Sequence, residues 1–581
     1  MAVENLITEH IDIWTSAVKT KSTSGRGSSK KLELYGVKKL RELILELAVR
    51  GKLVPQDAND EPVATLLKQN HIEQSRLTVE ENLKTKASQS ILDSEEYILV
   101  PETWGRIKLG NLAKFIDYRG KTPKKLSAGV RLITAKNVKF GYLSLQPEEF
   151  ISEAEYKTWM TRGFPRIGDI LFTPEAPLGN VAQVDLEEKF ALAQRAICLQ
   201  FHLSDISNYL RLFLMSPSFQ NLLSEKATGT TAKGIKASVL KELVVYIPPI
   251  EEQHRIVAKV DELMALCDQL EQQTEDSIEA HQVLVTTLLD TLTNSADADE
   301  LMQNWARISE HFDTLFTTEE SIDQLKQTIL QLAVMGKLVP QDPSDEPAAE
   351  LLKRIAEEKA RLVKEKKIKK QKALPPITED EKPFELPNGW EWCSLSCLGY
   401  FFGGKTPSKS NSSFWGGDVL WVTPKDMKRT HIDNSEDKIT QAGVDSGLTL
   451  VEVNSLMCVT RSGILRRHFP VALAKKQCTV NQDLKVLSFY DNTVADYVLL
   501  MMQGFEQHIL DKLTKTGTTV ESLKFDEFSV YPFMLPPLKE QRRIVSKVED
   551  LMIMCEELKA RLKHSQIIQQ QLTDSIAGQA V

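Results

Sequence analysis

The chain contains an internal repeat, which constrains its fold more than any other feature because both copies must fold alike. The stretch LRELILELAVRGKLVPQDANDEPVATLLKQ at 40–69 returns as LKQTILQLAVMGKLVPQDPSDEPAAELLKR at 325–354, with 20 of 30 positions identical. A second pair is IPPIEEQHRIVAKVDELMALCDQLE, from Ile247, and LPPLKEQRRIVSKVEDLMIMCEELK, from Leu535. The two offsets, 285 and 288 residues, nearly agree. We therefore expect two copies of one unit, joined by the polar segment 294–300.

Similarity between the copies is high in the flanks and low between them. Within the dissimilar part, GKTP at 120–123 returns at 404–407, and GTT at 229–231 returns at 517–519. The first copy carries an extra Ser-, Gly- and Lys-rich stretch at 19–31, which predicts a flexible loop. The pattern indicates one scaffold used twice, carrying two different modules.

Two long helices follow the modules. No proline or glycine occurs from 251 to 293, and Pro248 and Pro249 suit a helix start. Apolar residues recur at three- and four-residue spacing: Ile256, Val260, Leu263, Cys267 and Leu270 in the first helix, and Ile544, Val548, Leu551, Cys555 and Leu558 in the second. We expect the helices to pair antiparallel as a coiled coil; the alternative is that each packs on its own domain. Shorter flanking helices should end at Gly51 and Gly336.

The modules read as compact α+β domains. Short strand-like runs occur at 130–134, 169–173, 197–201 and 419–423, and helical stretches at 206–226 and 495–513. The fold class is thus α+β with an internal twofold repeat. The expected parts are a helical flank (1–100), a first variable domain (101–249), a spacer helix (250–294), a second flank (295–386), a second variable domain (387–536) and a second spacer helix (537–581).

Charge is unevenly distributed. The whole chain carries −8, yet 103–147 holds ten Lys or Arg and one acid, Asp117. The second variable domain has a basic cluster between Arg461 and Lys476. Lysine runs are often only a solvated surface, but one cluster in each domain favours phosphate, and hence nucleic acid, as the partner.

Arginine and amide side chains add candidates for reading base edges, since Arg suits guanine and Asn or Gln suits adenine. A single Asn or Gln can equally cap a turn. The candidate DNA-binding residues are Arg119, Lys121, Thr122, Lys124, Lys125, Arg131, Lys136, Asn137, Gln194, Arg195, Thr230 and Lys233 in the first domain, and Lys405, Lys425, Arg461, Arg466, Arg467, Asn481, Gln482 and Thr518 in the second.

Catalytic and metal motifs are weak. Residues 399–406 match the phosphate-loop pattern, but bulky Tyr400, Phe401 and Phe402 would obstruct a loop that must wrap phosphates. Asp169, Glu187 and Lys189 only loosely resemble a nuclease metal site, and the second copy lacks the acid pair. The seven cysteines form no zinc pattern. We predict no catalytic residues and no metal site.

The remaining composition is ordinary. Hydrophobic residues make up 42% of the chain and charged residues 26%, values typical of a soluble protein. No apolar run approaches a membrane span, and the amino terminus does not resemble a secretion signal. These features predict a cytoplasmic protein without a membrane partner.

The repeated motifs resemble those of the specificity subunit of type I restriction-modification systems. The resemblance lies in the helix openers IPPIEEQHRIV and LPPLKEQRRIV, the preceding GTT…IK segments (229–236 and 517–524), and the duplicated LAVRGKLVPQD and LAVMGKLVPQD, the last typical of the subgroup called type IB. It covers nearly the whole chain. It implies a non-catalytic subunit whose two target recognition domains read a split, asymmetric site in double-stranded DNA.

By the same resemblance, the partners would be two methyltransferase subunits and two restriction and translocation subunits. S-adenosylmethionine, ATP and Mg²⁺ would belong to those partners, and this chain would bind no cofactor. The alternatives are a phosphate-loop or metal-dependent nuclease with its own activity, and a coiled-coil scaffold that binds only proteins.

Overall fold

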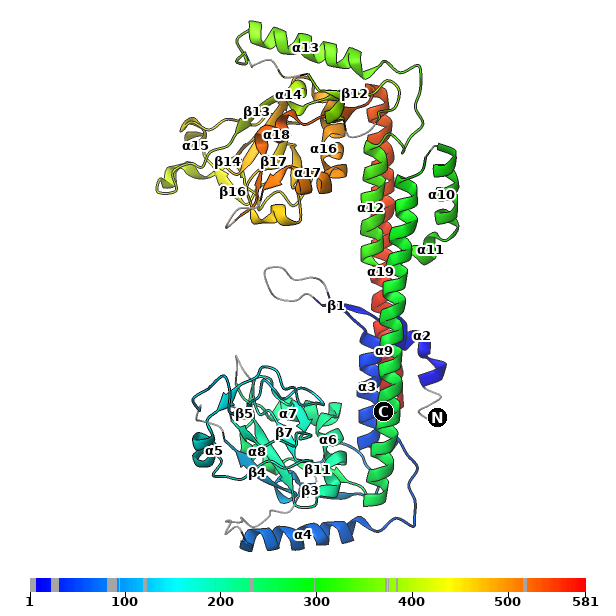
Figure 1. The fold of residues 1–581 in the computed structure, drawn as a ribbon, viewed down its shortest axis with the longest axis vertical. Coiled ribbons are helices and arrows are strands. Elements are labelled where there is room, and N and C mark those ends of the chain that lie inside the picture. Colours follow the sequence, from blue (N-terminus) through cyan, green and yellow to red (C-terminus); the bar gives the residue numbers. More distant parts are fainter. Residues whose placement is uncertain are drawn as a thin grey trace. The chain divides into compact units, whose positions relative to one another are not determined.

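The computed structural model describes residues 7–21, 31–80, 91–92, 95–118, 123–193, 195–229, 233–296, 298–370, 374, 376–382, 385–515 and 520–581. The chain forms two compact units (Figure 1). Unit 1 consists of Met1–Ser277 with Ser565–Val581, and unit 2 of Ile278–His564. The division cuts through both long helices, so each unit holds one variable domain, one flank and an end of each long helix.

Unit 1 contains the first variable domain and its flanking helices. Its elements are α2 (Ile11–Ser16), β1 (Lys19–Lys21), β2 (Lys31–Glu33), α3 (Tyr35–Val49), α4 (Val63–Glu80), β3 (Gly105–Lys108), β4 (Ala113–Asp117), β5 (Val130–Ile133), β6 (Phe150–Ile151), α5 (Glu153–Trp159), β7 (Ile170–Phe172), β8 (Val181–Gln183), β9 (Phe190–Leu192), β10 (Ile197–Phe201), α6 (Ser207–Met215), α7 (Pro217–Lys226), α8 (Ala237–Glu242), β11 (Val244–Ile247) and α9 (Ile250–Thr293), which continues into unit 2.

Unit 2 repeats this plan. Its elements are α10 (Ala298–Glu310), α11 (Phe312–Leu315), α12 (Glu319–Val334), α13 (Ala348–Lys364), β12 (Glu391–Cys393), α14 (Leu395–Leu398), β13 (Gly399–Gly403), β14 (Trp415–Val422), β15 (His431–Ile432), β16 (Asp437–Ile439), α15 (Gln441–Asp445), β17 (Leu456–Val459), β18 (Val471–Ala474), β19 (Cys478–Val480), β20 (Leu484–Phe489), α16 (Ala495–Gly504), α17 (Glu506–Lys512), β21 (Thr514–Lys515), β22 (Ser522–Leu523), α18 (Phe525–Val530), β23 (Phe533–Leu535) and α19 (Leu538–Ala580), which continues into unit 1.

The two variable domains share one sheet topology. The main sheet of the first has the order β4, β10, β7, β8, and that of the second has β13, β20, β17, β18 and adds β15. A second sheet has the order β6, β5, β9 in the first domain and β16, β14, β19 in the second. In each, two strands run parallel: β5 with β9, and β14 with β19. The predicted α+β repeat is therefore confirmed.

The predicted flexible loop at 19–31 is wrong at its ends. Strands β1 and β2 pair antiparallel, with Lys19 opposite Glu33 and Lys21 opposite Lys31. The Ser-, Gly- and Lys-rich composition of this stretch did not predict the pairing, because strand β1 is only three residues long. Residues 22–30, the centre of the stretch, lie outside the described residues.

The helix ends predicted at Gly51 and Gly336 are confirmed. Both glycines have positive φ, +68° and +71°. In each copy the amide one residue later bonds back into the last turn: Lys52 to the Leu47 carbonyl (3.0 Å) and Lys337 to the Leu332 carbonyl (2.9 Å). Glycine suits this position because the left-handed conformation carries no Cβ penalty.

The apolar stripes of the long helices are buried except at Leu270, Leu551 and Leu558, which are half-buried. Ile256, Val260, Leu263 and Cys267 are at most 1% exposed. In unit 2, Ile544, Val548 and Cys555 join one core with residues of α12 and of the last part of α9. In unit 2 the stripe of α19 therefore shares a core with the flanking helix α12 and with the last part of α9.

Ion pairs and hydrogen bonds show the helix directions in unit 2. Along α12, Asp323 pairs with Lys559 and Lys326 with Glu556, so α12 and α19 are antiparallel. Gln324 lies near the middle of α12 and bonds to Thr286.

At the end of α12, Lys337 Nζ bonds to the Thr293 carbonyl (2.9 Å). This helix and the last part of α9 therefore run parallel, since contacts advance in the same direction along both. It follows that α9 and α19 are antiparallel where they meet in unit 2.

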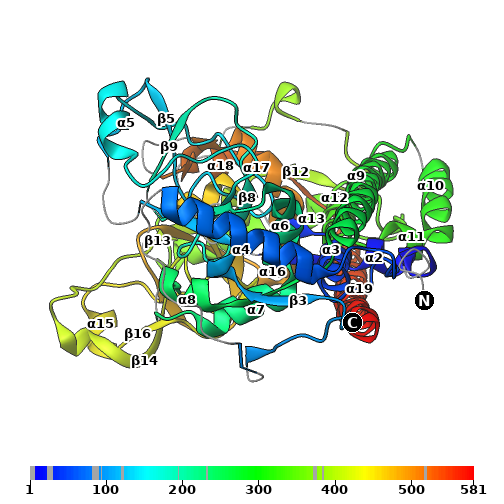
Figure 2. The same cartoon turned by 90° about the horizontal axis from the view of Figure 1, so that it is seen from below.

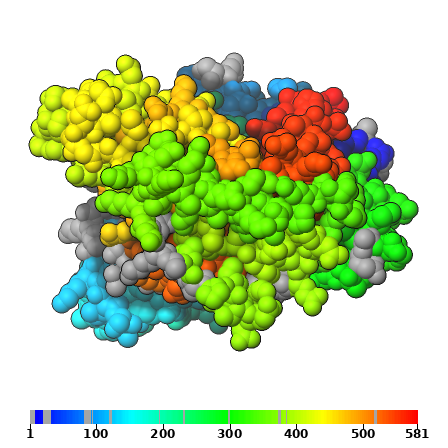
Figure 3. Space-filling model, turned by 90° about the horizontal axis from the view of Figure 1, so that it is seen from above, coloured from blue at the N-terminus to red at the C-terminus, as the bar shows by residue number. Residues whose placement is uncertain are grey.

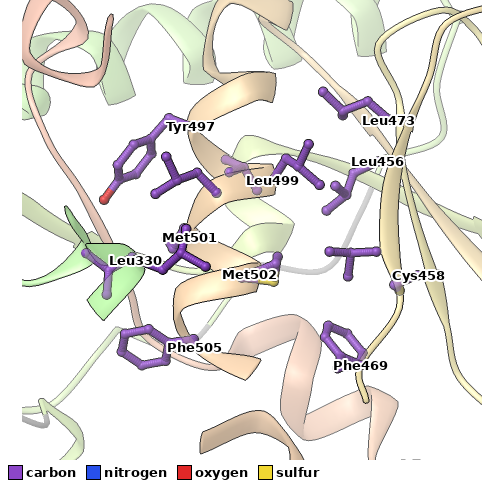
Figure 4. Close-up of a cluster of buried hydrophobic side chains, with 14 of the residues drawn as sticks. Leu330, Leu456, Cys458, Phe469, Leu473, Tyr497, Leu499, Met501, Met502 and Phe505 are labelled. Carbon is purple, nitrogen blue, oxygen red and sulfur yellow. The ribbon is translucent and has the colours of Figure 1, made fainter. Parts of the chain in front are cut away.

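Helices fix each variable domain to its scaffold. In unit 2, α16 lies between the main sheet and α12, and its apolar side chains point to both (Figure 4). Leu330 of α12 faces Met501 and Phe505, while Met502 faces Cys458 and Phe469. In unit 1, α6 takes the same place beside α3 (Figure 1).

A further helix covers each variable domain. In unit 1, α4 lies across β3 (Figure 2), and Asn70 donates to the Asn111 carbonyl at 2.9 Å. In unit 2, α13 lies on the surface (Figure 3) and buries Leu351 and Ile355. The scaffold therefore holds each domain from two directions, which leaves the loop-bearing edge of its sheets to form a site.

Candidate nucleic-acid interface

Four loops of the second variable domain meet at one edge of its sheets. The amide of Lys405 donates to the Val480 carbonyl (3.0 Å), and the amide of Asn481 donates to the Val422 carbonyl (3.0 Å). The amide of Thr460 donates to the Asp483 carbonyl (2.8 Å). We call residues 404–407, 423–426, 460–462, 481–483 and 520–523 the second recognition edge.

The GTT…IK segment completes this edge. The amide of Leu523 donates to the Thr460 carbonyl (2.9 Å), and the amide of Ser462 donates to the Glu521 carbonyl (3.2 Å). Segments 460–462 and 520–523, which lie far apart in sequence, thus hold each other by backbone hydrogen bonds. The edge is a built surface, not a set of independent loops.

The GKTP turn needs its glycine for close approach. A Cβ on Gly404 would lie 2.1 Å from the Val480 carbonyl oxygen and 2.2 Å from that of Asn481. The turn follows strand β13 and is followed only by a short 3-10 helix (Ser412–Phe414), whereas a phosphate loop opens an α-helix. This geometry differs from that of a phosphate loop, and the prediction that the chain binds no nucleotide stays a prediction.

The first variable domain repeats the arrangement. The amide of Ala193 donates to the Ile133 carbonyl (3.0 Å), and the amide of Ile235 donates to the Pro174 carbonyl (2.9 Å). We call residues 123–125, 134–137, 174–176, 193, 195–196 and 233–235 the first recognition edge. The described candidates Lys124, Lys125, Lys136, Asn137, Arg195 and Lys233 lie in these segments, whereas Arg131 lies outside them.

Nine of the candidate residues are exposed on these edges, and they are the residues best placed to contact a ligand. They are Lys124, Lys125, Lys136, Arg195 and Lys233 in the first domain, and Lys405, Lys425, Arg461 and Gln482 in the second. Lys136 and Lys425 occupy equivalent positions in the turns TAKN (134–137) and TPKD (423–426). Six other candidates, Arg119, Lys121, Thr122, Gln194, Thr230 and Thr518, lie outside the described residues.

Asn137 and Asn481 are corrected from base readers to structural residues. Asn137 is 1% exposed. Its Oδ1 accepts from the Thr134 amide (3.1 Å), and its Nδ2 donates to the Ser144 carbonyl (3.0 Å). Asn481 is 6% exposed and exchanges hydrogen bonds with Asp483. These amides hold turns, the alternative that sequence reasoning had left open, because their polar atoms are used inside the fold.

The positive field of the first domain is weaker than its count of charges suggests. Arg131 contacts Glu188 (2.6 Å) and Glu148 (3.2 Å), and Lys125 contacts Glu149 (2.8 Å). These acids lie outside the counted stretch in sequence, and folding brings them back to it. Sequence charge counts miss this because they see only local neighbours.

The second basic cluster is also partly paired. Arg466 Nε donates to Glu521, and this bond holds the pKa of Glu521 below its usual range. His468 contacts Glu506 at 2.7 Å. Arg467 is exposed. Arg466 therefore anchors the GTT…IK segment, and its prediction as a DNA contact stays untested.

The residues that loosely resemble a nuclease metal site do not assemble into one. Asp169 is buried, accepts from Gln200 (2.8 Å), and has its pKa raised by burial. Lys189 instead pairs with Glu153 (2.6 Å). Across the described part of the chain, no cluster of three or more His, Cys, Asp or Glu is arranged to hold a metal ion.

Sequence reasoning missed two acidic residues of the recognition edges. Glu175 contacts Arg195 on the first edge, with 3.2 Å between Oε1 and Nε. Asp483 lies beside Gln482 on the second. An alignment of the two copies strand by strand would have pointed to both positions. It places an acid of one domain opposite an arginine of the other at each of them.

The fold and its two edges define a protein with two variants of one recognition module on a shared helical scaffold. The family model "Type I restriction modification DNA specificity domain" matches residues 101–280 and 387–566. The chain is 40% identical to the type I restriction enzyme EcoAI specificity subunit and 39% to the EcoEI specificity subunit, both from Escherichia coli, over 100% of each chain. It belongs to the family of type I restriction-modification specificity subunits.

A solved structure shows a further likeness. The HsdS subunit from Thermoanaerobacter tengcongensis aligns at 17% identity with a TM-score of 0.40, over 84% of this chain and 98% of that chain.

Proposed function

We propose that the two recognition edges contact the two halves of a split site in double-stranded DNA, and that the chain directs partner subunits to that site. The observation that carries the proposal is the equivalent placement of exposed cations on both edges, above all Lys136 and Lys425 in matching turns. Phosphate contacts position a protein on DNA, whereas base contacts provide its sequence preference. Each edge offers lysines for the first role and an arginine for the second.

The catalytic partners follow from the family. As a specificity subunit the chain carries no catalysis of its own. We infer two methyltransferase subunits that use S-adenosylmethionine to modify adenine, and two ATP- and Mg²⁺-dependent motor and nuclease subunits. We also infer that the chain belongs to the type IB subgroup.

The setting we infer is the cytoplasm. Among the described residues, no helix combines the length and apolar character needed to cross a bilayer.

Selection from a random duplex library by the chain in complex with its methyltransferase partner tests the proposal. We expect an enriched sequence of two specified parts separated by an unspecified gap. Replacing the cation of one edge, as in Arg195→Gln, should alter one part, and Arg461→Gln should alter the other. Retention of no duplex at all would favour a protein-binding scaffold, and DNA cleavage by the isolated chain would favour a nuclease.

A further inference from the structure

Strand register makes positions in the two variable domains directly comparable. In the first main sheet Phe172 pairs with Ile197, and in the second Cys458 pairs with Lys485. Each pair lies between the same two neighbouring strands of the shared topology. Residues counted from these pairs are therefore structurally equivalent.

Glu175 and Arg461 occupy one such equivalent position. Each lies three residues after the paired residue of its strand. Each also forms an isolated bridge to the GTT…IK segment: Glu175 to Gly234, and Arg461 to Ser522. The match thus rests on two independent backbone contacts.

Arg195 and Asp483 occupy a second equivalent position. Each lies two residues before the paired residue of the neighbouring strand. One edge therefore carries Glu175 and Arg195, and the other carries Arg461 and Asp483 at the same two places. The acid and the base have exchanged positions.

The first pair is preorganised. Glu175 Oε1 lies 3.2 Å from Arg195 Nε, and the side chains are 41% and 59% exposed. Arg195 has φ +65°. Non-glycine residues are strained in this region, and such strain concentrates at functional sites. Both side chains remain open to a ligand.

The second pair is held differently. Asp483 accepts from Asn481 Nδ2 at 3.1 Å, which fixes its carboxylate on the edge. Arg461 is exposed, and within the described part of the chain its guanidinium contacts no carboxylate. Both charged groups are thus available to a ligand that offers acceptors and a donor together.

A G·C base pair offers that combination in the major groove. Guanine presents the O6 and N7 acceptors, which suit arginine, and the paired cytosine presents the N4 donor, which suits a carboxylate. We propose that each pair of an acid and an arginine reads one G·C base pair. Because the acid and the arginine have exchanged positions, the guanine should lie on opposite DNA strands in the two half-sites when the two domains are superposed. This inference rests on the proposed function, because it requires the edges to face DNA.

The reading pairs can be changed without endangering the fold. An exposed ion pair contributes little to stability, so its variants should fold. Glu153 and Lys189 form a matched control, because this exposed ion pair (2.6 Å) lies at the other end of β9 in the same domain.

The experiment is the selection described above, run with the complexes of wild type, Arg195→Gln, Arg461→Gln and the double exchange Glu175→Arg with Arg195→Glu. We expect each single variant to lose about 10- to 100-fold preference for guanine at one position of its own half-site. The double exchange should convert that G·C position of the first half-site to C·G. Glu153→Gln with Lys189→Gln should select the wild-type site.

Three outcomes overturn the inference. Unchanged preferences in both single variants would show that the arginines do not read bases. Relaxation at an A·T position would assign another base pair to the edge. A wild-type complex without any sequence preference would contradict the proposed function itself, and the inference with it, whereas the first two outcomes leave the proposed function intact.

Discussion

Arg255 and Asp60 form a two-bond ion pair in unit 1, with Nη1 to Oδ1 at 2.9 Å and Nη2 to Oδ2 at 2.6 Å. Unit 2 repeats the contact between Arg543 and Asp345 at 2.7 Å. The arginines belong to the helix openers, and the aspartates to the duplicated DEP segments. The best-matched parts of the repeat therefore bond to each other, which explains their similarity as a structural requirement of the scaffold.

Replacing Asp60 with Asn should destabilise unit 1. The Asp60 side chain is 7% exposed, and the variant loses the charge that Arg255 binds. Hydrogen bonds to charged groups contribute about 1.5–3 kcal/mol, so a loss of this order is expected in denaturant unfolding. The exposed neighbour Glu61→Gln is the control. Equal stabilities of the two variants would contradict the role of this ion pair.

Glu540 should make stability depend on pH. It is 1% exposed at the start of α19, and burial raises its pKa from 4.5 to about 7. The folded state therefore holds this proton more tightly than the unfolded state, and stability should fall as pH rises from about 4.5 to 7. Glu540→Gln removes the titration.

The variant should therefore melt above wild type at pH 8 and alongside it near pH 4. Exposed Glu557 on the same helix provides a control as Glu557→Gln. A gain in melting temperature that is the same at every pH would argue against the titration of Glu540.

Gly504→Ala should loosen the contact between α16 and α12. A Cβ there would lie 2.7 Å from Val334 Cγ1 and 2.8 Å from the Leu330 carbonyl oxygen. Overpacking costs about 1–3 kcal/mol, which exceeds the helix propensity of about 1 kcal/mol that alanine adds. Gly578→Ala on α19, where nothing lies within 4 Å, should be neutral or stabilising. Thermal melting compares the two, and equal stabilisation would disprove the close approach.

Lys136→Ala and Lys425→Ala should weaken binding of the complex equally on cognate and scrambled duplexes. Each variant should reduce the slope of log affinity against log salt by about one, because each removes one phosphate contact. Lys353 on α13, exposed and paired with Glu350 at 2.9 Å, serves as the control position. Titrations at several salt concentrations measure the slope, and an unchanged slope would remove these turns from the DNA interface.

Exchange of the variable domains should preserve the fold. The junctions match, since Gln253 Nε2 donates to the Pro248 carbonyl (2.9 Å) and Gln541 Nε2 to the Pro536 carbonyl (2.8 Å). With 387–536 in place of 101–248, the subunit should read the second half-site twice and methylate an interrupted palindrome. Sequencing of methylated host DNA checks this, and survival of the original asymmetric pattern would show that the domains are not modular.

Much of this architecture could be predicted because it depends on local pattern. The repeat, the stripes from Ile256 to Cys267 and the glycine helix ends at Gly51 and Gly336 follow from spacing and backbone preference, which act over a few residues. The convergence of GKTP, Gln482 and Arg461 on one edge agrees with their selection from sequence.

Tertiary structure decided what long-range contacts determine. Asn137 and Asn481 are candidate base readers in the sequence but buried turn residues in the fold, where their amides bond to Thr134 and Ser144 and to Asp483. Glu148 and Glu188 neutralise Arg131 only after the strands pair. The acid and the arginine are seen to exchange positions between the two edges only when the strand register aligns the two domains. Local pattern selects helices, strands and turns, whereas burial and charge pairing depend on which distant segments the fold brings together.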